Sequence, residues 1–332
     1  MKIVAPTPQS FVQAIEQMNI PELRAQYGLE ARCCVEEGYA WERISSQLGQ
    51  FIQMRAKIAG QTLPKFSVII PSYERPDHLV ALMTQLQRQV ERDFEVIIVD
   101  QSAQPWEGSK NDYGFALTYY FSPIKGAVRA RNTGAMLAQG EILAFVDDDC
   151  LPQSDWLVNA RDYFARTQVV GLEGKIYSDH FDDPAYRPVS NVGSEGIGFM
   201  TANLMVRSSV FQYLGGFDLQ FDRPHFREDT DFGWRMLDLG EVPYAGDVAV
   251  FHPAQKREIE RESFAARAHF FEKDALLCEK HPARYRILCE FERHYERTPG
   301  FAEHLVRGFA LLGKAPPAWL LKKLNLSLTE RE

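Results

Sequence analysis

Short apolar runs alternate with amphipathic segments through the middle of the chain. Four runs have strand length and are rich in β-branched and aromatic residues: "FSVII" (66–70), "FEVIIVD" (94–100), "LTYYF" (117–121) and "EILAFVD" (141–147). Strands that alternate with helices form βαβ units, which build a parallel sheet covered on both faces. The pattern therefore predicts an α/β domain with a mostly parallel sheet and helices on both faces.

Two segments between these runs have apolar residues at helical spacing. "DHLVALMTQLQRQ" (77–89) is the first, with Leu79, Leu82, Met83 and Leu86 on one face. The second, "GAVRARNTGAMLAQG" (126–140), ends at Gly140, which we expect to cap the helix. The alternation weakens over 164–255, where turns rich in Gly, Pro and Asp indicate a functional loop.

The two ends of the chain differ from this middle. Residues 1–62 have a polar helical pattern, and residues 256–332 are charged and helical at first. We therefore expect an N-terminal helical extension (1–62), a central α/β domain (63–255) and a C-terminal helical region (256–332). The basic, apolar and aromatic segment 300–328 is compatible with a peripheral membrane contact, or with a helix pair on the domain or on a second subunit of a homo-oligomer.

Composition limits the range of functions. The chain has 332 residues, of which 45% are hydrophobic and 25% charged, and its formal net charge of −8 argues against nucleic acid as a partner. The five cysteines form no CxxC pair, the N-terminus has no signal-peptide pattern, and no apolar run approaches the roughly 18 residues of a membrane span. We therefore expect a cytoplasmic protein with reduced thiols.

Polar residues follow the predicted strands at the carboxyl edge of the sheet, where open α/β sheets bind ligands. The first strand ends in Pro71-Ser72-Tyr73-Glu74-Arg75, the second in Asp100-Gln101-Ser102, and the fourth in Asp147-Asp148-Asp149. Carboxylates that converge at one edge repel each other unless a cation lies between them. Since Mg²⁺ and Mn²⁺ prefer oxygen ligands, the sequence predicts a divalent-metal site.

Two other interpretations of the acid triplet are open. "DCLPQSDWL" (149–157) resembles a helix start, so the acids could form a turn and an N-cap. A strand followed by Asp-x-Asp also resembles the nucleophile of haloacid-dehalogenase-type phosphatases. That chemistry needs a later acidic pair, and "GDVAVFH" (246–252) lacks its second acid.

Four segments in order resemble family-2 glycosyltransferases of the GT-A fold, over about residues 64–255. They are "FSVIIPSYERPDHLVALMTQL", "FEVIIVDQS", "GAVRARNTGAMLAQGEILAFVDDDCLPQSDWL" and "LGGFDLQFDRPHFREDTDFGWRMLDLGE". The resemblance implies a Rossmann-like GT-A domain that moves a sugar from a nucleotide-diphosphate donor to a saccharide or lipid-linked acceptor, with inversion. It also implies Mn²⁺ or Mg²⁺, which neutralises the charge on the leaving diphosphate.

The resemblance assigns residues to the donor side. It implies Asp149 as metal ligand, Asp147 as a supporting acid, and His252 as a further metal ligand or a structural histidine. Residues implied to bind the nucleotide-sugar are Pro71, Tyr73, Arg75, Asp100, Gln101, Arg131, Asp148 and Asn203.

Four of these donor-side residues have alternatives. Tyr73 could instead be a half-buried aromatic at the end of the strand. Arg75 could instead form a surface salt bridge with Glu74 or Asp77, and Arg131 could be a structural charge. Gln101 stands where the family usually has an acid, and because an amide both donates and accepts, uridine specificity is open.

On the acceptor side, the resemblance points to Glu228 and Asp229 in "FREDTDFGWRM". It implies that Asp229 removes the acceptor hydroxyl proton, a role that suits a carboxylate whose pKa is raised by an apolar pocket. An acidic helix N-terminus would explain the same residues without chemistry. Two other functions fit part of the pattern: a sugar-1-phosphate nucleotidyltransferase, although "PSYERPDHL" (71–79) has no Gly-rich loop, and a non-catalytic nucleotide-sugar-binding module.

Overall fold

The computed structural model describes residues 64–122, 124–257, 270–285 and 287–288. The predicted helices of 1–62 and the segment 300–328 lie outside the described residues. Among the helices described, none is long and apolar enough to span a membrane.

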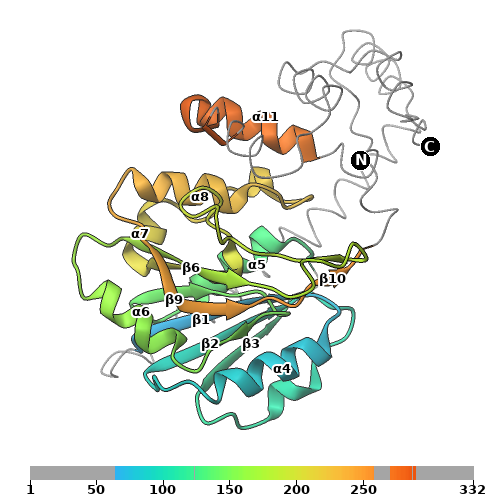
Figure 1. Ribbon diagram of the computed structural model, residues 1–332. Coiled ribbons are helices and arrows are strands. Elements are labelled where there is room, and N and C mark those ends of the chain that lie inside the picture. Colours follow the sequence, from blue (N-terminus) through green and yellow to red (C-terminus); the bar gives the residue numbers. More distant parts are fainter. Residues whose placement is uncertain (1–63, 123, 258–269, 286, 289–332) are drawn as a thin grey trace, which may run out of the picture. The chain divides into compact units, whose positions relative to one another are not determined.

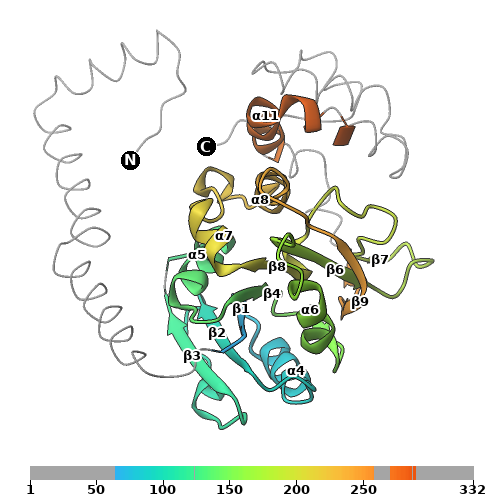
Figure 2. The same cartoon turned by 90° about the vertical axis from the view of Figure 1, so that its left-hand side faces the viewer.

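An eight-stranded sheet forms the centre of the described domain, in the order β3-β2-β1-β4-β8-β6-β9-β5 (Figure 1). Its strands are β1 (Phe66–Ser72), β2 (Phe94–Asp100), β3 (Ala116–Phe121), β4 (Ile142–Phe145), β5 (Leu151–Pro152), β6 (Gly171–Tyr177), β8 (Leu204–Arg207) and β9 (Tyr244–Phe251). The first four are parallel to one another, whereas β8 runs antiparallel to β4 and β6. The four predicted strands are thus confirmed, and β1 to β4 lie side by side in Figure 2.

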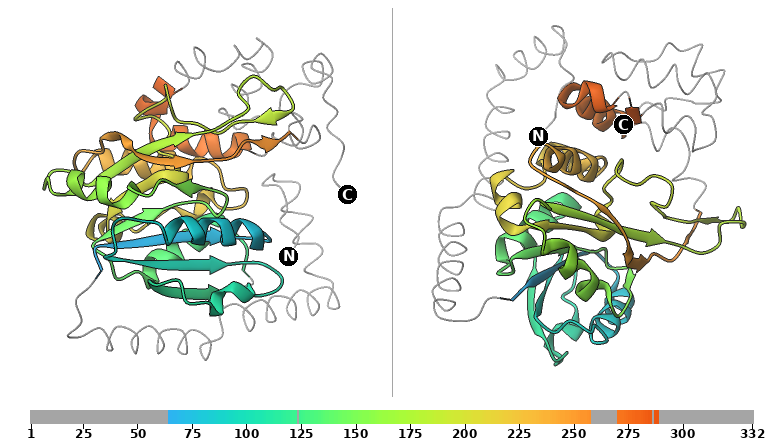
Figure 3. Two further views of the ribbon diagram at one scale, coloured as in Figure 1. Left: turned by 60° about the horizontal axis from the view of Figure 1, so that its bottom comes forward. Right: turned by 60° about the vertical axis from the view of Figure 1, so that its left-hand side comes forward.

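Helices cover both faces of the sheet, as predicted (Figure 3). On one face, α4 (Pro76–Leu86) and α6 (Trp156–Phe164) pack on the side of β1 formed by the even-numbered residues Phe66, Val68 and Ile70. On the other face, α5 (Ala127–Leu137), α7 (Ser208–Tyr213) and α8 (Glu228–Leu237) share a second apolar core with Ile69. Successive residues of a strand point to opposite faces, so a continuous apolar strand supplies both cores.

Short elements complete the described chain. Three 3₁₀ helices are η1 (Glu107–Lys110), η2 (Thr201–Asn203) and η3 (Leu219–Phe221). A separate pair of strands, β7 (Tyr186–Arg187) and β10 (Gln255–Lys256), joins the long loop after β6 to the chain after β9. The buried face of α4 consists of Leu79, Leu82, Met83 and Leu86, the four residues that its sequence spacing predicts.

The helix α11 (Phe270–Lys280) packs against α8 through ion pairs. Arg227 Nε lies 2.8 Å from Asp274, and the fully buried Asp231 of α8 receives Lys280 Nζ at 2.5 Å and His281 Nε2 at 3.0 Å. A buried carboxylate is costly unless cations or hydrogen-bond donors surround it. The region after 255 therefore adds to the contact that Asp231 already makes within α8, where Arg235 Nε lies 2.8 Å away.

Two predictions about local structure are wrong. Gly140 does not cap α5, which ends at Leu137 with Ala138 as its C-cap. A Cβ atom at Gly140 would lie 2.6 Å from the backbone nitrogen of Ser67, so glycine is required there by close approach to β1. The acids 147–149 are not a helix N-cap either, because β5 follows them and α6 begins at Trp156.

The Gly140→Ala variant tests this close approach. We expect it to lower the free energy of unfolding by about 2 kcal/mol, since the new methyl group must displace the backbone of β1. Gly246→Ala is the matched control, because a Cβ there would meet only Tyr244, at an ordinary 3.8 Å. Urea unfolding of both variants measures the difference, and equal stabilities would contradict the explanation.

Candidate active site

The register of the sheet brings the ends of β1 and β2 level with each other, whereas β4 ends three residues earlier along β1. Ser72 at the end of β1 pairs with Asp100 at the end of β2, and Ile69 pairs with Phe145 at the end of β4. The amide of Val146 still donates to Ile69 O before the chain turns into the acid triplet. The polar residues that follow these strands therefore gather at one edge, as predicted.

Two arginines compensate the acid triplet. Arg75 Nη1 donates to Asp148 at 3.0 Å and to Asp149 at 2.7 Å, while Arg131 Nη2 donates to Asp147 at 2.9 Å. Burial tends to raise the pKa of Asp147, but the charge and hydrogen bond of Arg131, together with weaker contributions from His252 and His225, hold that pKa below its usual value. For Asp148 burial prevails over Arg75, and its pKa is raised. The salt bridge of Arg75 to Glu74 or Asp77 is not the one formed.

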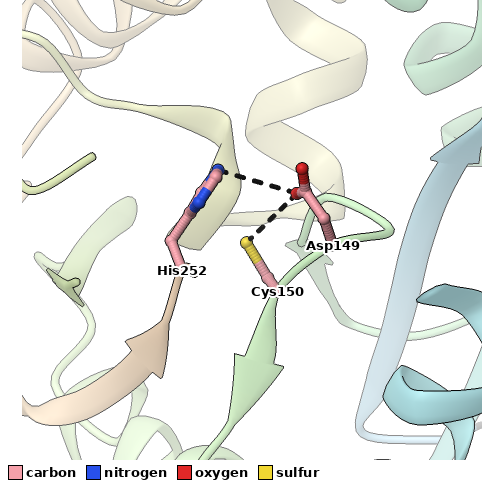
Figure 4. Close-up of side chains that lie close together, drawn as sticks. All are labelled: Asp149, Cys150 and His252. Atoms are coloured by element: carbon pink, nitrogen blue, oxygen red, sulfur yellow. Dashed lines mark hydrogen bonds and ion pairs between the residues drawn. The ribbon is translucent and has the colours of Figure 1, made fainter. Parts of the chain in front are cut away.

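Asp149, Cys150 and His252 lie together at the end of β9 and the start of β5, and they are the group among the described residues that could hold a metal ion (Figure 4). His252 Nε2 is 3.6 Å and Cys150 Sγ 4.0 Å from Asp149 Oδ1. The other oxygen, Oδ2, accepts from Gln255 Nε2 at 2.7 Å. Asp147 is not part of this group, because its carboxylate is held by Arg131.

Cys150 is a poor ligand for such an ion. Its side chain is fully buried, and this burial, together with the charges of Asp147 and Asp149, raises the pKa of its thiol well above the usual value. Metal binding requires the thiolate, whereas Mn²⁺ and Mg²⁺ prefer oxygen ligands. The residues that fit a hard divalent cation are therefore Asp149 and His252.

Asp100 and Gln101 have internal partners. Asp100 is buried and accepts hydrogen bonds from Ser102 N at 2.9 Å and from Tyr119 Oη at 2.6 Å. Gln101 Nε2 donates to Ile124 O at 2.6 Å, and its Oε1 accepts from Gly126 N at 3.1 Å. Gln101 thus clamps the loop that leads into α5, which is a structural use of its ability to donate and accept.

Tyr73 lies at the exposed border of this edge. The residue is 44% exposed, and Lys125 Nζ lies over its ring, 4.3 Å from the centroid, and contacts the phenol oxygen. Pro71 is half-buried within β1, opposite Val99. The roles of Tyr73 and Pro71 in binding a nucleotide stay predictions.

The structure does not bring Asn203 to this group. Its side chain is fully buried, accepts from Trp156 Nε1 at 2.8 Å, and donates to Lys175 O at 2.9 Å and to Val248 O at 2.8 Å. These bonds tie α6, β6 and β9 together. The role of Asn203 in binding a donor sugar stays a prediction.

Glu228 and Asp229 form the first turn of α8, so the acidic helix start is observed. Arg131 Nη1 donates to Glu228 at 2.9 Å, which links this pair to the acid triplet. Burial, and then the neighbouring charge of Glu228, raises the pKa of Asp229 to about 7. A helix N-terminus acts in the opposite direction by favouring the charged form. The net effect is therefore to raise the pKa of Asp229 toward neutral pH.

Sequence reasoning missed Lys125, Cys150 and Gln255. Cys150 follows the triplet directly, and that adjacency was a usable signal. Gln255 and Asp149 are separated by 106 residues, and Lys125 and Tyr73 by 52, so no local pattern indicates their contacts.

Comparison with known proteins identifies relatives. Residues 67–228 match glycosyl transferase family 2. Glycosyltransferase AglE of Haloferax volcanii is 29% identical over 215 residues, covering 58% of this chain and 68% of AglE. Several other curated relatives are matched over less than half of their own length.

Two solved structures share the fold. One is Staphylococcus aureus TarS 1–349 in complex with UDP-GlcNAc, with a TM-score of 0.58 and 20% identity over 78% of this chain and 80% of that chain. The other is the mannosyltransferase PcManGT from Pyrobaculum calidifontis in complex with GDP-Man and Mn²⁺, with a TM-score of 0.51 and 17% identity, covering 85% of this chain and 83% of that one. At these identities the likeness shows the fold alone.

The environment of Cys150 generates a chemical prediction. Because burial and carboxylates keep its thiol protonated, we expect iodoacetamide at pH 8 to leave Cys150 unmodified in the folded protein and to modify it fully in urea. Peptide mass spectrometry measures the extent, with the half-buried Cys278 as internal comparison. Rapid modification of native Cys150 would contradict the burial of this turn.

Proposed function

Because the chain belongs to glycosyl transferase family 2 and has the GT-A fold, we propose that it transfers a sugar from a nucleotide-diphosphate donor to an acceptor hydroxyl, with inversion at the sugar carbon and with a bound Mn²⁺ or Mg²⁺. The observation that carries the proposal is the ionic link from the strand-end acids through Arg131 to Glu228, next to a carboxylate with a pKa of about 7. It joins a cation-binding edge to a proton acceptor.

The donor would bind at the carboxyl ends of β1, β2 and β4. Tyr73 offers a ring face for the base, and Asp148 an oxygen for the ribose. Arg75, which pairs with Asp148 and Asp149, would turn toward the donor phosphates. TarS was solved with UDP-GlcNAc and PcManGT with GDP-Man, so either nucleotide is a reasonable first probe.

Asp149 and His252 would hold the metal ion. When bound, a divalent cation stabilises the negative charge that develops on the diphosphate leaving group. A carboxylate oxygen and an imidazole nitrogen form a donor set that Mn²⁺ accepts, and PcManGT was solved with Mn²⁺. The remaining coordination positions are left for donor oxygens and water.

Asp229 would act as the base in a single displacement. The acceptor oxygen forms a bond to the anomeric carbon while the bond from that carbon to the diphosphate oxygen breaks, and the electron pair leaves with the nucleoside diphosphate. The acceptor proton passes to Asp229. A base with a pKa near the working pH performs this transfer efficiently, because it is ionised and still has appreciable proton affinity. The acceptor, whether saccharide or lipid-linked, the cytoplasmic location and the oligomeric state stay predictions.

Metal-dependent nucleotide binding is the first test. We expect UDP or GDP with Mn²⁺ to raise the midpoint of thermal unfolding, since a ligand at about 100 times its Kd stabilises by about 2.7 kcal/mol. Asp149→Ala should abolish the shift and His252→Ala should weaken it, because both remove a metal ligand. Cys150→Ser is the matched control and should retain it. Equal shifts with EDTA in place of Mn²⁺ would contradict the metal assignment.

The pH dependence of the reaction is the second test. Asp229 must be ionised to accept a proton, so kcat/KM should rise with pH through a midpoint of about 7 and level off above it. Asp229→Asn should lower the transfer rate by about 10³-fold while nucleotide binding persists. The exposed Asp162→Asn serves as control. Transfer by Asp229→Asn at the normal rate would remove Asp229 as the base.

A further inference from the structure

Arg131 makes both of its terminal contacts to protein carboxylates. It is 4% exposed, and its two Nη atoms donate to Asp147 and Glu228, each at 2.9 Å. The two acids come from different elements, the turn after β4 and the first residue of α8. One buried guanidinium therefore joins the donor-side acids to the acid pair on α8.

Pairing is a physical requirement for all three groups. Glu228 is 3% exposed, and a buried carboxylate or guanidinium without its partner loses several kcal/mol of solvation. The Nε atom of Arg131 is buried and has no hydrogen-bond partner. Both Nη atoms of Arg131 donate to carboxylates, and the side chain is buried. Arg131 is therefore poorly placed to bind a diphosphate.

Neighbouring residues of α5 hold the same segments. The side chain of Asn132 binds both backbone groups of Phe217. It accepts a hydrogen bond from Phe217 N at 2.9 Å and donates one to Phe217 O at 2.8 Å. Val128 N donates to Asp222 at 3.3 Å. The segment 217–228, which leads to Asp229, is thus attached to α5 at three places. The first turn of α8 has a fixed position relative to the helix beside the acid triplet.

We propose that Arg131 is a positioning residue that fixes the base Asp229 relative to the donor-binding acids through the ionic bridge Asp147–Arg131–Glu228. This inference rests on the proposed function and replaces the nucleotide contact that the sequence suggested for Arg131. The bridge sets the distance between the two reacting partners, because Asp229 follows Glu228 directly in the first turn of α8. A displacement of about 1 Å at a reacting group is enough to lower a rate about 10²-fold.

The electrostatics of Asp229 support the bridge. The charged and titratable groups around it are Glu228, Arg131, Arg227 and His225. Beyond the effect of burial, Glu228 raises the pKa of Asp229, whereas Arg131 and Arg227 lower it. Loss of Arg131 alone therefore raises the pKa of Asp229. When the charge of Glu228 is removed as well, the pKa of Asp229 falls again and much of that rise is offset.

The test uses Arg131→Met, Glu228→Gln and the double variant, with the exposed Arg129→Met on the same helix as control. Three properties of each variant are measured. They are the Mn²⁺-dependent affinity for UDP or GDP, the kcat and KM for hydrolysis of the matching UDP-GlcNAc or GDP-Man, and the pH profile of that hydrolysis. For Arg131→Met we expect nucleotide affinity within about threefold of wild type and kcat about 10²-fold lower. The pH at which the rate of Arg131→Met reaches half of its maximum should be higher than in the wild type. In the double variant this midpoint should return toward the wild-type value.

Stability supplies an independent readout. Arg131→Met leaves the buried Glu228 and the partly exposed Asp147 without their cation, so its thermal midpoint should fall about 5 °C or more below that of the double variant, which leaves only Asp147. A tenfold or greater loss of nucleotide affinity in Arg131→Met, or a double variant whose loss of stability equals the sum of the two single losses, would overturn the bridge. If the wild type neither binds nucleotide nor hydrolyses donor, the proposed function fails, and the stability cycle still decides the bridge.

Discussion

The active edge of this domain depends on the compensation of buried carboxylates by arginines. Asp148 and Glu228 are almost fully buried, and Asp147, Asp149 and Asp229 lie close by on the same two turns. Five acids in so small a volume would drive the turns apart in the absence of Arg75 and Arg131. The two arginines differ in kind, since Arg75 is 40% exposed on its side chain and free to change partners, whereas Arg131 is fixed in the interior. Arg75 is suited to exchange its carboxylate partners for a ligand, whereas Arg131 is suited to hold the two turns in position.

This division explains how a metal and a diphosphate would enter the site without disturbing the fold. Asp148 and Asp149 accept hydrogen bonds from Arg75 and Gln255, whose long side chains lie at the exposed border. The bonds of Arg131 to Asp147 and Glu228 would stay in place when a ligand binds. The core beneath the edge, formed by the apolar strands β1, β2 and β4, supports the inner set.

The sequence was sufficient to predict the strands, the parallel half of the sheet, the buried face of α4 and the edge at which the acids gather, because these follow from periodicity and from strand direction. Partner choice could not be predicted in the same way. Arg75 has acids beside it in the chain, yet it pairs with Asp148 and Asp149, more than 70 residues away. Gly140 and Asn203 have structural roles set by contacts with Ser67 and Trp156, which only the tertiary arrangement reveals.

The ion pairs between α8 and α11 have a consequence for where this protein can be divided. The family match ends at residue 228, the first residue of α8, while Asp231 of that helix pairs with Arg235 in α8 and with Lys280 and His281 beyond it. The matched segment therefore ends before several of the contacts that α8 makes. A fragment cut at 255 would keep every residue of the proposed site and lose Asp274, Lys280 and His281, which pair with the helix that carries Asp229.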